Sequence, residues 1–337
     1  MLHGTLYRPF STAAGVCNRG YSFPLQRCLT DFGADDSFSH AVRKVREHYG
    51  VDVPTSAVQR ITEHHADQMR EQEHLLDEFP DGAGAAYVIV EADGSMIPLV
   101  ETAKVATDQP SDGRRRRKVK WQEARLALAH QLGSVTPVFG VTMGGVDDAG
   151  DQMLNCAIKA GGCSRSTIHC VGDGATWLAD QTDRVYADQG SYLVDFFHLS
   201  DYLAAAAPRC CPDDPTKWRK ETQLSVKTGQ ISQVLDDLEL HLEPQTTADK
   251  DAPVRCCHRY IRNRPGQFAY DKAIDAGLPI GSGEIESAHR YVVQKRLKIA
   301  GAWWLEDNAR KMLALRTVRA NGYWEKYWER HNSLCAA

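Results

Sequence analysis

The chain has 337 residues, of which 42% are hydrophobic and 25% are charged, as in an ordinary globular protein with one large domain or two modest ones. No apolar run approaches the length of a membrane span, and the N-terminus lacks the layout of a signal peptide, so we expect a cytoplasmic protein with no membrane partner. The formal net charge of −4 excludes a uniformly basic nucleic-acid-binding protein, but not one with segregated charge.

Residues 1–80 predict a helical region that binds DNA. The first thirty or so residues look irregular, and then "SFSHAVRKVREHYG" follows a helical pattern that ends at Gly50. A second helix, "TSAVQRITEHHADQM", begins with Thr55 as its cap. Two helices across a tight turn, over about 37–70, suit a helix-turn-helix whose second helix offers Gln59 and Arg60 to DNA. An ordinary helical hairpin fits the pattern equally well.

From Gly84 to about residue 207 the pattern predicts a sheet with helices. "AAYVIVEADGSMIPLVE" has Asp-Gly between two β-rich runs, which predicts a hairpin with Asp93 at the end of its first strand. "KVKWQEARLALAH" and "VTPVFGVTM" predict further strands, and a helix follows near 151–161. "STIHCVGDGATWLADQ" and "SYLVDFFHLSDYLAAAA" each predict a strand and then a helix. This order predicts an α/β fold with a ribonuclease H-like mixed sheet.

Residues 208–276 are mostly helical in pattern and predict an insertion into that core. Residues 277–337 would complete the core with a glutamate-bearing helix and C-terminal amphipathic helices. The tryptophans of this last part are expected in the core. The cysteine pairs at 210–211 and 256–257 are adjacent in sequence, whereas zinc sites space paired cysteines by two to four residues, so reduced thiols are favoured over zinc.

The stretch "LPIGSGEIESAHRYVVQKRLK" has carboxylates first and cations after. Ser282 can cap the helix, and Glu284 and Glu286 suit its positive end, so capping alone explains the acidic residues. The alternative is a divalent metal held between carboxylate and DNA phosphate. The basic residues that would then contact phosphates are Arg290, Lys295, Arg296 and Lys298.

Basic residues also gather in two longer segments. From Arg290 to Arg330 there are ten Lys or Arg against four Asp or Glu, and six of the seven residues from Arg114 to Lys120 are basic. The run of Arg114, Arg115, Arg116 and Arg117 predicts a loop that contacts DNA, with a merely solvated loop as the alternative.

A metal site for phosphoryl transfer needs carboxylates that converge from separate elements. Asp93, with Glu91 as its rival on the same strand face, and Asp173, after a buried strand, lie at edges of predicted elements. With Glu286 they form a candidate set for two magnesium ions that bracket an in-line displacement at phosphorus.

Seven stretches resemble bacterial insertion-sequence transposases of the DDE superfamily, in the Kra-type branch, and more distantly the mutator-like transposases. They span nearly the whole chain in the expected order and read "YRPFSTAAGV", "PLQRCLTDFGADDSFSHAV", "VEADGSMIPL", "GDGATWL", "LVDFFHLSDYL", "GSGEIESAHRYVVQKRLKIAGAWW" and "MLALRTVRANGYW". The resemblance implies a ribonuclease H-like core interrupted by a helical insertion and preceded by a DNA-binding region.

Carried over residue by residue, the resemblance implies that Asp93, Asp173 and Glu286 are the catalytic and metal-binding residues. Asp195 and His198 match the family's Asp-x-x-His element, in which the aspartate could orient the imidazole and the histidine could hold DNA beside the scissile phosphate. Such an enzyme uses two Mg²⁺ ions, for which Mn²⁺ can substitute, and cuts its own element's inverted repeats. It then joins their 3′-hydroxyls to target DNA, as a dimer or higher assembly on the bacterial nucleoid. A ribonuclease H-fold nuclease without strand transfer and a non-catalytic repressor are the alternatives.

Overall fold

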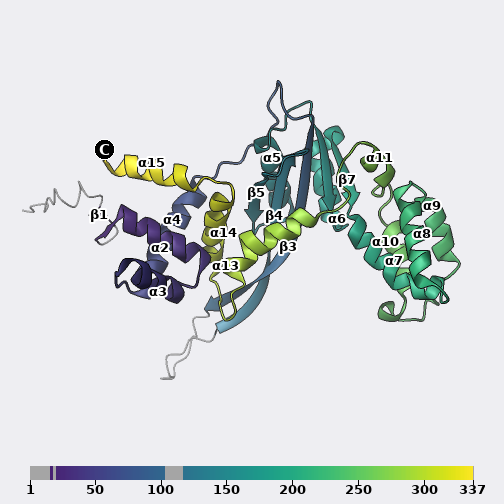
Figure 1. Ribbon diagram of the computed structural model, residues 1–337, viewed down its shortest axis with the longest axis horizontal. Coiled ribbons are helices and arrows are strands. Elements are labelled where there is room, and N and C mark those ends of the chain that lie inside the picture. Colours follow the sequence, from purple (N-terminus) through teal and green to yellow (C-terminus); the bar gives the residue numbers. More distant parts are fainter. Residues whose placement is uncertain (1–15, 18–19, 103–116, 337) are drawn as a thin grey trace, which may run out of the picture.

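The computed structural model describes residues 16–17, 20–102 and 117–336, and a five-stranded mixed sheet lies at its centre (Figure 1). The strands are β3 (Tyr87–Thr102), β4 (Arg117–Gln131), β5 (Val138–Thr142), β6 (Thr167–Gly172) and β7 (Gly190–Val194). Their order across the sheet is β5-β4-β3-β6-β7. Strand β4 runs antiparallel to both neighbours, whereas β3, β6 and β7 are parallel. The mixed α/β class is therefore confirmed, and this sheet is compatible with the expected ribonuclease H-like core.

The predicted hairpin at Asp93-Gly94 is wrong, because β3 passes through these residues as one strand of 16 residues. Asp93 pairs with Leu126 and Gly94 pairs with Arg125 in an unbroken antiparallel ladder. A Cβ at Gly94 would lie only 2.0 Å from an oxygen of the Glu123 side chain, so glycine serves close packing here and not a turn. Asp93 consequently lies inside the strand. The connection between β3 and β4 falls outside the described residues.

Helices cover both faces of the sheet. Helices α5 (Val146–Lys159) and α6 (Thr176–Tyr186) pack over the first half of β3 and the second half of β4, on a cluster that includes Val90 and Ala127. The opposite face buries Ile97 and Leu126 under α12 (Gly283–Ala288) and α14 (Glu306–Ala320). Between these two helices lie a π-helix, His289–Gln294, and α13 (Lys295–Leu297).

The N-terminal part is more ordered than its sequence predicts. A short ribbon of β1 (Val16–Cys17) and β2 (Tyr21–Ser22) leads into α2 (Phe23–Asp35), where an irregular segment was expected. Helices α3 (Phe38–Tyr49) and α4 (Thr55–Glu71) follow, as predicted, and Gly50 ends α3 with a φ of 64°. Pro54, not Thr55, occupies the N-cap of α4. Whether α3 and α4 act as a helix-turn-helix stays a prediction.

The segment from 208 to 276 is helical and lies at the β7 end of the sheet (Figure 1). Helix α7 leads into it, and its residues share one hydrophobic cluster with the end of β7. The elements are α7 (Phe196–Cys210), α8 (Pro215–Lys227), α9 (Ile231–Glu239), α10 (Pro253–Arg262) and α11 (Tyr270–Asp275), with a 3₁₀ turn at Asp249–Asp251. Another 3₁₀ turn, Ala187–Gln189, joins α6 to β7.

At the far end of the chain, α15 (Trp324–Ala336) packs on the N-terminal helices. Its Trp328 is buried, and the ring lies 4.5 Å from that of His65 on α4. None of the helices in the described ranges is long and apolar enough to cross a membrane. The eight cysteines whose side chains the structure describes are all free thiols: Cys28, Cys156, Cys163, Cys170, Cys210, Cys211, Cys256 and Cys257.

Candidate active site

Three aspartates stand level with one another at the carboxyl edge of the parallel strands. The register pairs Glu91 with Val171 on β3 and β6, and Gly172 with Val194 on β6 and β7. Continued by one or two residues, it brings Asp93, Asp173 and Asp195 into one row. Because neighbouring strands lie about 4.8 Å apart, carboxylates in such a row are close enough to affect one another.

The Asp93 carboxylate is the group that links this row electrostatically. Burial raises its pKa, the nearby histidine His289 lowers it, and the negative charge of Asp173 raises it further. His198 is also close enough to act on the same carboxylate. The sequence predicts Asp93, Asp173 and His198 as site residues from three separate motifs. In the structure, Asp173 and His198 both act electrostatically on the carboxylate of Asp93.

The loop that bears Asp173 is fastened by the helical segment. Gly174 has a φ of 85°, in the left-handed region, and the Asp173 carboxylate accepts a hydrogen bond from the Ala175 amide at 2.8 Å. From α10 and the residues after it, the Tyr260 hydroxyl donates to the Asp173 carbonyl at 2.7 Å, and Arg264 donates to the Gly174 carbonyl at 2.6 Å. No local sequence pattern predicts these two contacts, because they join residues about ninety positions apart.

Asp195 is buried and serves as an anchor between strand, helix and turn. One of its oxygens caps α7 by accepting from the amides of Phe197 at 2.5 Å and His198 at 3.4 Å. The other accepts from both the amide and the hydroxyl of Ser282, at 2.7 and 2.6 Å. Ser282 occupies the N-cap position of α12, as predicted, but its hydroxyl is directed to Asp195 and makes no cap bond. Asp195 thus ties the turn before α12 to the sheet.

Helix α12 lies along β3 and is held to it at two points. The buried Glu91 carboxylate accepts from the Ile285 amide at 2.8 Å, and His289 approaches the Asp93 carbonyl at 3.0 Å. A carbonyl can only accept, so Nε2 of His289 carries the proton. Burial lowers the pKa of His289, and its buried Nδ1 has no hydrogen-bond partner among the described residues.

The two glutamates of α12 lie on different sides of Ile285. Glu284 approaches His130 on β4, with 3.4 Å between its carboxylate and Nε2. Glu286 is exposed and stands one helical turn before His289, the residue that contacts Asp93. Since β3 lies between β4 and β6 in the sheet, the side of α12 away from His130 is the side toward β6 and Asp173.

The basic residues after α12 divide into exposed and buried ones. Arg290, Lys295 and Lys298 are exposed, and Lys295 also pairs with Asp35 at 3.4 Å. Arg296, by contrast, is only 2% exposed. It donates to the Gly33 carbonyl at 2.9 Å, and burial lowers its pKa to about 10.

The guanidinium of Arg296 is also sandwiched between aromatic rings. It lies 4.7 Å from the ring centre of Phe38 and 4.6 Å from that of Trp304. The prediction that Arg296 contacts DNA is therefore wrong: this side chain joins α2 and α3 to the core.

The other predicted DNA contacts fall on the N-terminal helices and on the β3–β4 connection. Gln59 is exposed on the outer face of α4, where it donates to Glu63 at 2.9 Å, and Arg60 lies beside it. Arg114, Arg115 and Arg116 lie outside the described residues, as does the side chain of Arg117 at the start of β4.

The side chains of the site do not form a ready metal cage. Within the described ranges, no group of three or more His, Cys, Asp or Glu is arranged to hold a metal ion. What the site offers is a pair of interacting carboxylates, Asp93 and Asp173, and an exposed glutamate on α12, one helical turn before the histidine that contacts Asp93. Burial and mutual repulsion both oppose the charge on Asp93, which is the condition that a bound cation relieves.

Comparison with known proteins adds little to this geometry. No protein-family model matches the chain, and no curated protein matches it. Among solved structures, the chain matches the Drosophila P element transposase strand transfer complex with a TM-score of 0.34 and 8% sequence identity. The match covers 96% of this chain and 84% of that one. A likeness of this size does not show what the chain does.

Proposed function

We propose that this protein is a DNA transposase that cuts and joins the ends of its own insertion sequence by metal-dependent phosphoryl transfer. The observation that carries the proposal is the interaction of the Asp93 and Asp173 carboxylates at one edge of a mixed sheet, beside His198 and beneath α12. We interpret the sheet as a ribonuclease H-like core and the carboxylates at its edge as a DDE motif. The sequence motifs support both interpretations.

Three carboxylates would hold the metal: Asp93, Asp173 and Glu286. Glu286 is preferred to its rival Glu284, because Glu284 is engaged with His130 on the β4 side. Glu91 is not a ligand in this proposal, because it is buried and already accepts the Ile285 amide. The chemistry that two Mg²⁺ ions would supply there is activation of the attacking hydroxyl and stabilisation of the leaving oxygen at phosphorus.

The remaining residues of the site position these three. Glu91 and Asp195 fix the start of α12 from two strands, so the height of Glu286 along β3 is determined by hydrogen bonds. Tyr260 and Arg264 hold the backbone of the Asp173 loop. His198, within electrostatic reach of Asp93, can donate to a phosphate oxygen beside the cut. Exposed Arg290, Lys295 and Lys298 continue along the helical segment and suit flanking phosphates.

The test separates binding from chemistry with Asp173→Asn. This change keeps the size of the side chain, and its oxygen can still accept from the Ala175 amide, but it removes the charge that a metal requires. Binding to DNA ends from the gene's own flanks should stay near that of the wild type. Cleavage and strand transfer should fall together by more than about 100-fold, since even outer partners of a metal site are worth 10–100-fold.

The outcomes distinguish the alternatives. A variant that still cuts at the wild-type rate would refute the carboxylate–metal mechanism. A wild type that cuts but never joins would be a ribonuclease H-fold nuclease. A wild type that binds the ends and does neither, in Mg²⁺ or Mn²⁺, would be a repressor. Sedimentation on end DNA checks the proposed dimer or higher assembly.

A further inference from the structure

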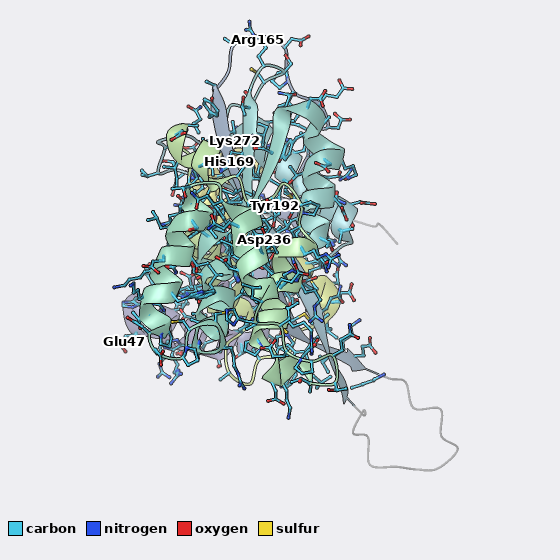
Figure 2. All side chains as sticks on the ribbon, turned by 90° about the vertical axis from the view of Figure 1, so that its right-hand side faces the viewer. Glu47, Arg165, His169, Tyr192, Asp236 and Lys272 are labelled. Atoms are coloured by element: carbon cyan, nitrogen blue, oxygen red, sulfur yellow. The ribbon has the colours of Figure 1, made fainter. Side chains whose placement is uncertain are left out.

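A pocket lies along the β5 edge of the sheet. Figure 1 shows β5 on the side of the sheet toward α4, α14 and α15. Figure 2 looks onto the opposite end of the molecule, where the helical segment that holds the Asp173 loop lies nearest to the viewer. The pocket has a volume of about 510 Å³, an ordinary size for a small-molecule site. Its described lining comes from β5, α4, α5, α14 and α15 and includes no residue of the candidate active site. We call it the edge pocket.

Part of this lining is strand backbone that β4 does not pair. The Phe139 amide donates to Oδ1 of Asn321 at 2.8 Å, and Nδ2 of Asn321 donates to the Phe139 carbonyl at 2.9 Å. These groups of Phe139 point out of the sheet, and so do those of Val141, because residues two apart on a strand direct their backbone groups the same way. Within the described ranges, no hydrogen bond closes the outward N–H and C=O of Val141.

The open stretch of this edge is only one residue long. On one side Asn321 already occupies Phe139. On the other side the Met143 carbonyl accepts from Gln122 at 3.1 Å and from Arg310 at 3.2 Å. A peptide that adds a strand to a sheet edge needs several consecutive residues, so it does not fit here. A compact group with a donor and an acceptor side by side does fit, as the carboxamide of Asn321 shows at the neighbouring position.

The charged side chains of the edge pocket are mostly positive. Among the described residues that line it, five are Lys or Arg and one, Glu73, is acidic. Arg70 and Arg310 already pair with carboxylates that do not line the pocket. The other three basic residues are exposed and have no ion-pair partner in the part of the chain that the structure describes: Lys159, Lys326 and Arg330. An anion therefore complements the charge of this pocket.

Apolar side chains supply much of the remaining lining, among them Met69, Leu313 and Val318. Gln152 on the α5 side is a polar exception. It is 5% exposed, and its buried Oε1 has no hydrogen-bond partner among the residues described. A ligand that complements all these groups has an apolar or aromatic body, a donor and an acceptor on one edge, and an anionic group.

We propose that the edge pocket binds a nucleotide. A nucleobase has an aromatic body and carries donors and acceptors side by side on its Watson–Crick edge, which pairs with the N–H and C=O of Val141. The phosphate lies against Lys159, Lys326 and Arg330, whose charge it complements. A free nucleotide and a nucleotide of a nucleic-acid strand offer this same chemistry. The site goes beyond the proposed function and does not depend on it.

Isothermal titration of the full-length protein tests the proposal. The probes are the four nucleoside 5′-monophosphates and a trideoxynucleotide of each base. Val141→Pro removes the outward N–H, and an edge strand tolerates proline where the N–H faces away from its neighbour. This variant should bind the probe roughly 10-fold more weakly, which is about the effect of one hydrogen bond.

A second variant leaves the strand untouched. Lys326→Ala combined with Arg330→Ala removes two of the cations and should also weaken binding by roughly 10-fold, since each can make a charge-assisted hydrogen bond to phosphate. Lys220→Ala, which removes an exposed cation on α8, should change nothing. Urea unfolding shows that each variant is folded, and the double variant still tests the site if Val141→Pro is not.

Binding of the monophosphates would identify a free nucleotide as the ligand, and binding of the trideoxynucleotides alone would identify a nucleotide within a strand. Absence of binding by either probe at millimolar concentration would overturn the proposal, as would an affinity that neither variant lowers. An acidic peptide that binds where no nucleotide does would make the edge pocket a peptide site instead. Cleavage of the element's ends is measured separately with Asp173→Asn, so these results leave the proposed function undecided.

Discussion

Glu91 offers a quantitative test of how α12 is held against the sheet. Its carboxyl is 2% exposed, and burial raises its pKa from the ordinary 4.5 to about 8. The folded protein therefore keeps a proton that the unfolded chain releases. The stability that this proton confers is fully present below the pKa of the unfolded chain, 4.5, and falls as the pH rises toward the pKa of the folded protein. By about pH 8 the loss reaches on the order of 5 kcal/mol.

Glu91→Gln cannot ionise, yet its side-chain oxygen can still accept from the Ile285 amide. Relative to that of the wild type, the unfolding free energy of the variant should therefore rise by about 3 kcal/mol between pH 6 and pH 8.5. Urea unfolding at both pH values measures it. The control is Glu101→Gln on the same strand, an exposed carboxylate paired with Lys120, for which we expect no such change. Parallel pH profiles for Glu91→Gln and the wild type would refute the burial argument.

Three further predictions concern cations and the Asp173 loop. Replacing Arg114, Arg115, Arg116 and Arg117 by alanine should weaken DNA binding and flatten its salt dependence by up to about 3.6 in the log–log slope, whereas an unchanged slope means a solvated loop. Arg296→Ala should lower stability by about 3 kcal/mol in urea unfolding, whereas Lys298→Ala should weaken DNA binding and leave stability unchanged. Gly174→Ala should lower the thermal midpoint, because its Cβ would lie 2.5 Å from the Tyr260 hydroxyl at a φ of 85°.

The sheet and the position of Asp173 at its edge could be predicted from the sequence, because a buried strand followed by an Asp-Gly turn is a local pattern. The Asp93-Gly94 step was misinterpreted for the same reason. Its local preference for a turn is overridden by continuous pairing of β3 with β4, which extends from Val88↔Gln131 to Thr102↔Arg117. Strand pairing over such distances is a tertiary effect that a short window does not contain.

Long-range packing explains the other differences. In the helical sequence pattern, Arg296 is one of several basic residues. Its burial depends on a contact with Gly33, 263 residues away, which the local pattern does not contain. Glu91 was considered only as a rival ligand, whereas its role depends on the Ile285 amide, 194 residues away. The contact of His289 with Asp93 likewise joins residues 196 positions apart, so no local pattern predicts it.

The central claim is that Asp93, Asp173 and Glu286 form one phosphoryl-transfer site, and a strand-transfer assay with four amide variants tests it most directly. End DNA from the gene's own flanks is incubated in Mg²⁺ with Asp93→Asn, Asp173→Asn, Glu286→Gln and Glu284→Gln. We predict that the first three bind the ends but neither cut nor join them, and that Glu284→Gln does both at close to the wild-type rate. Activity retained by Glu286→Gln and lost by Glu284→Gln would contradict the assignment of the third carboxylate. Activity in all four variants would contradict the proposed site itself.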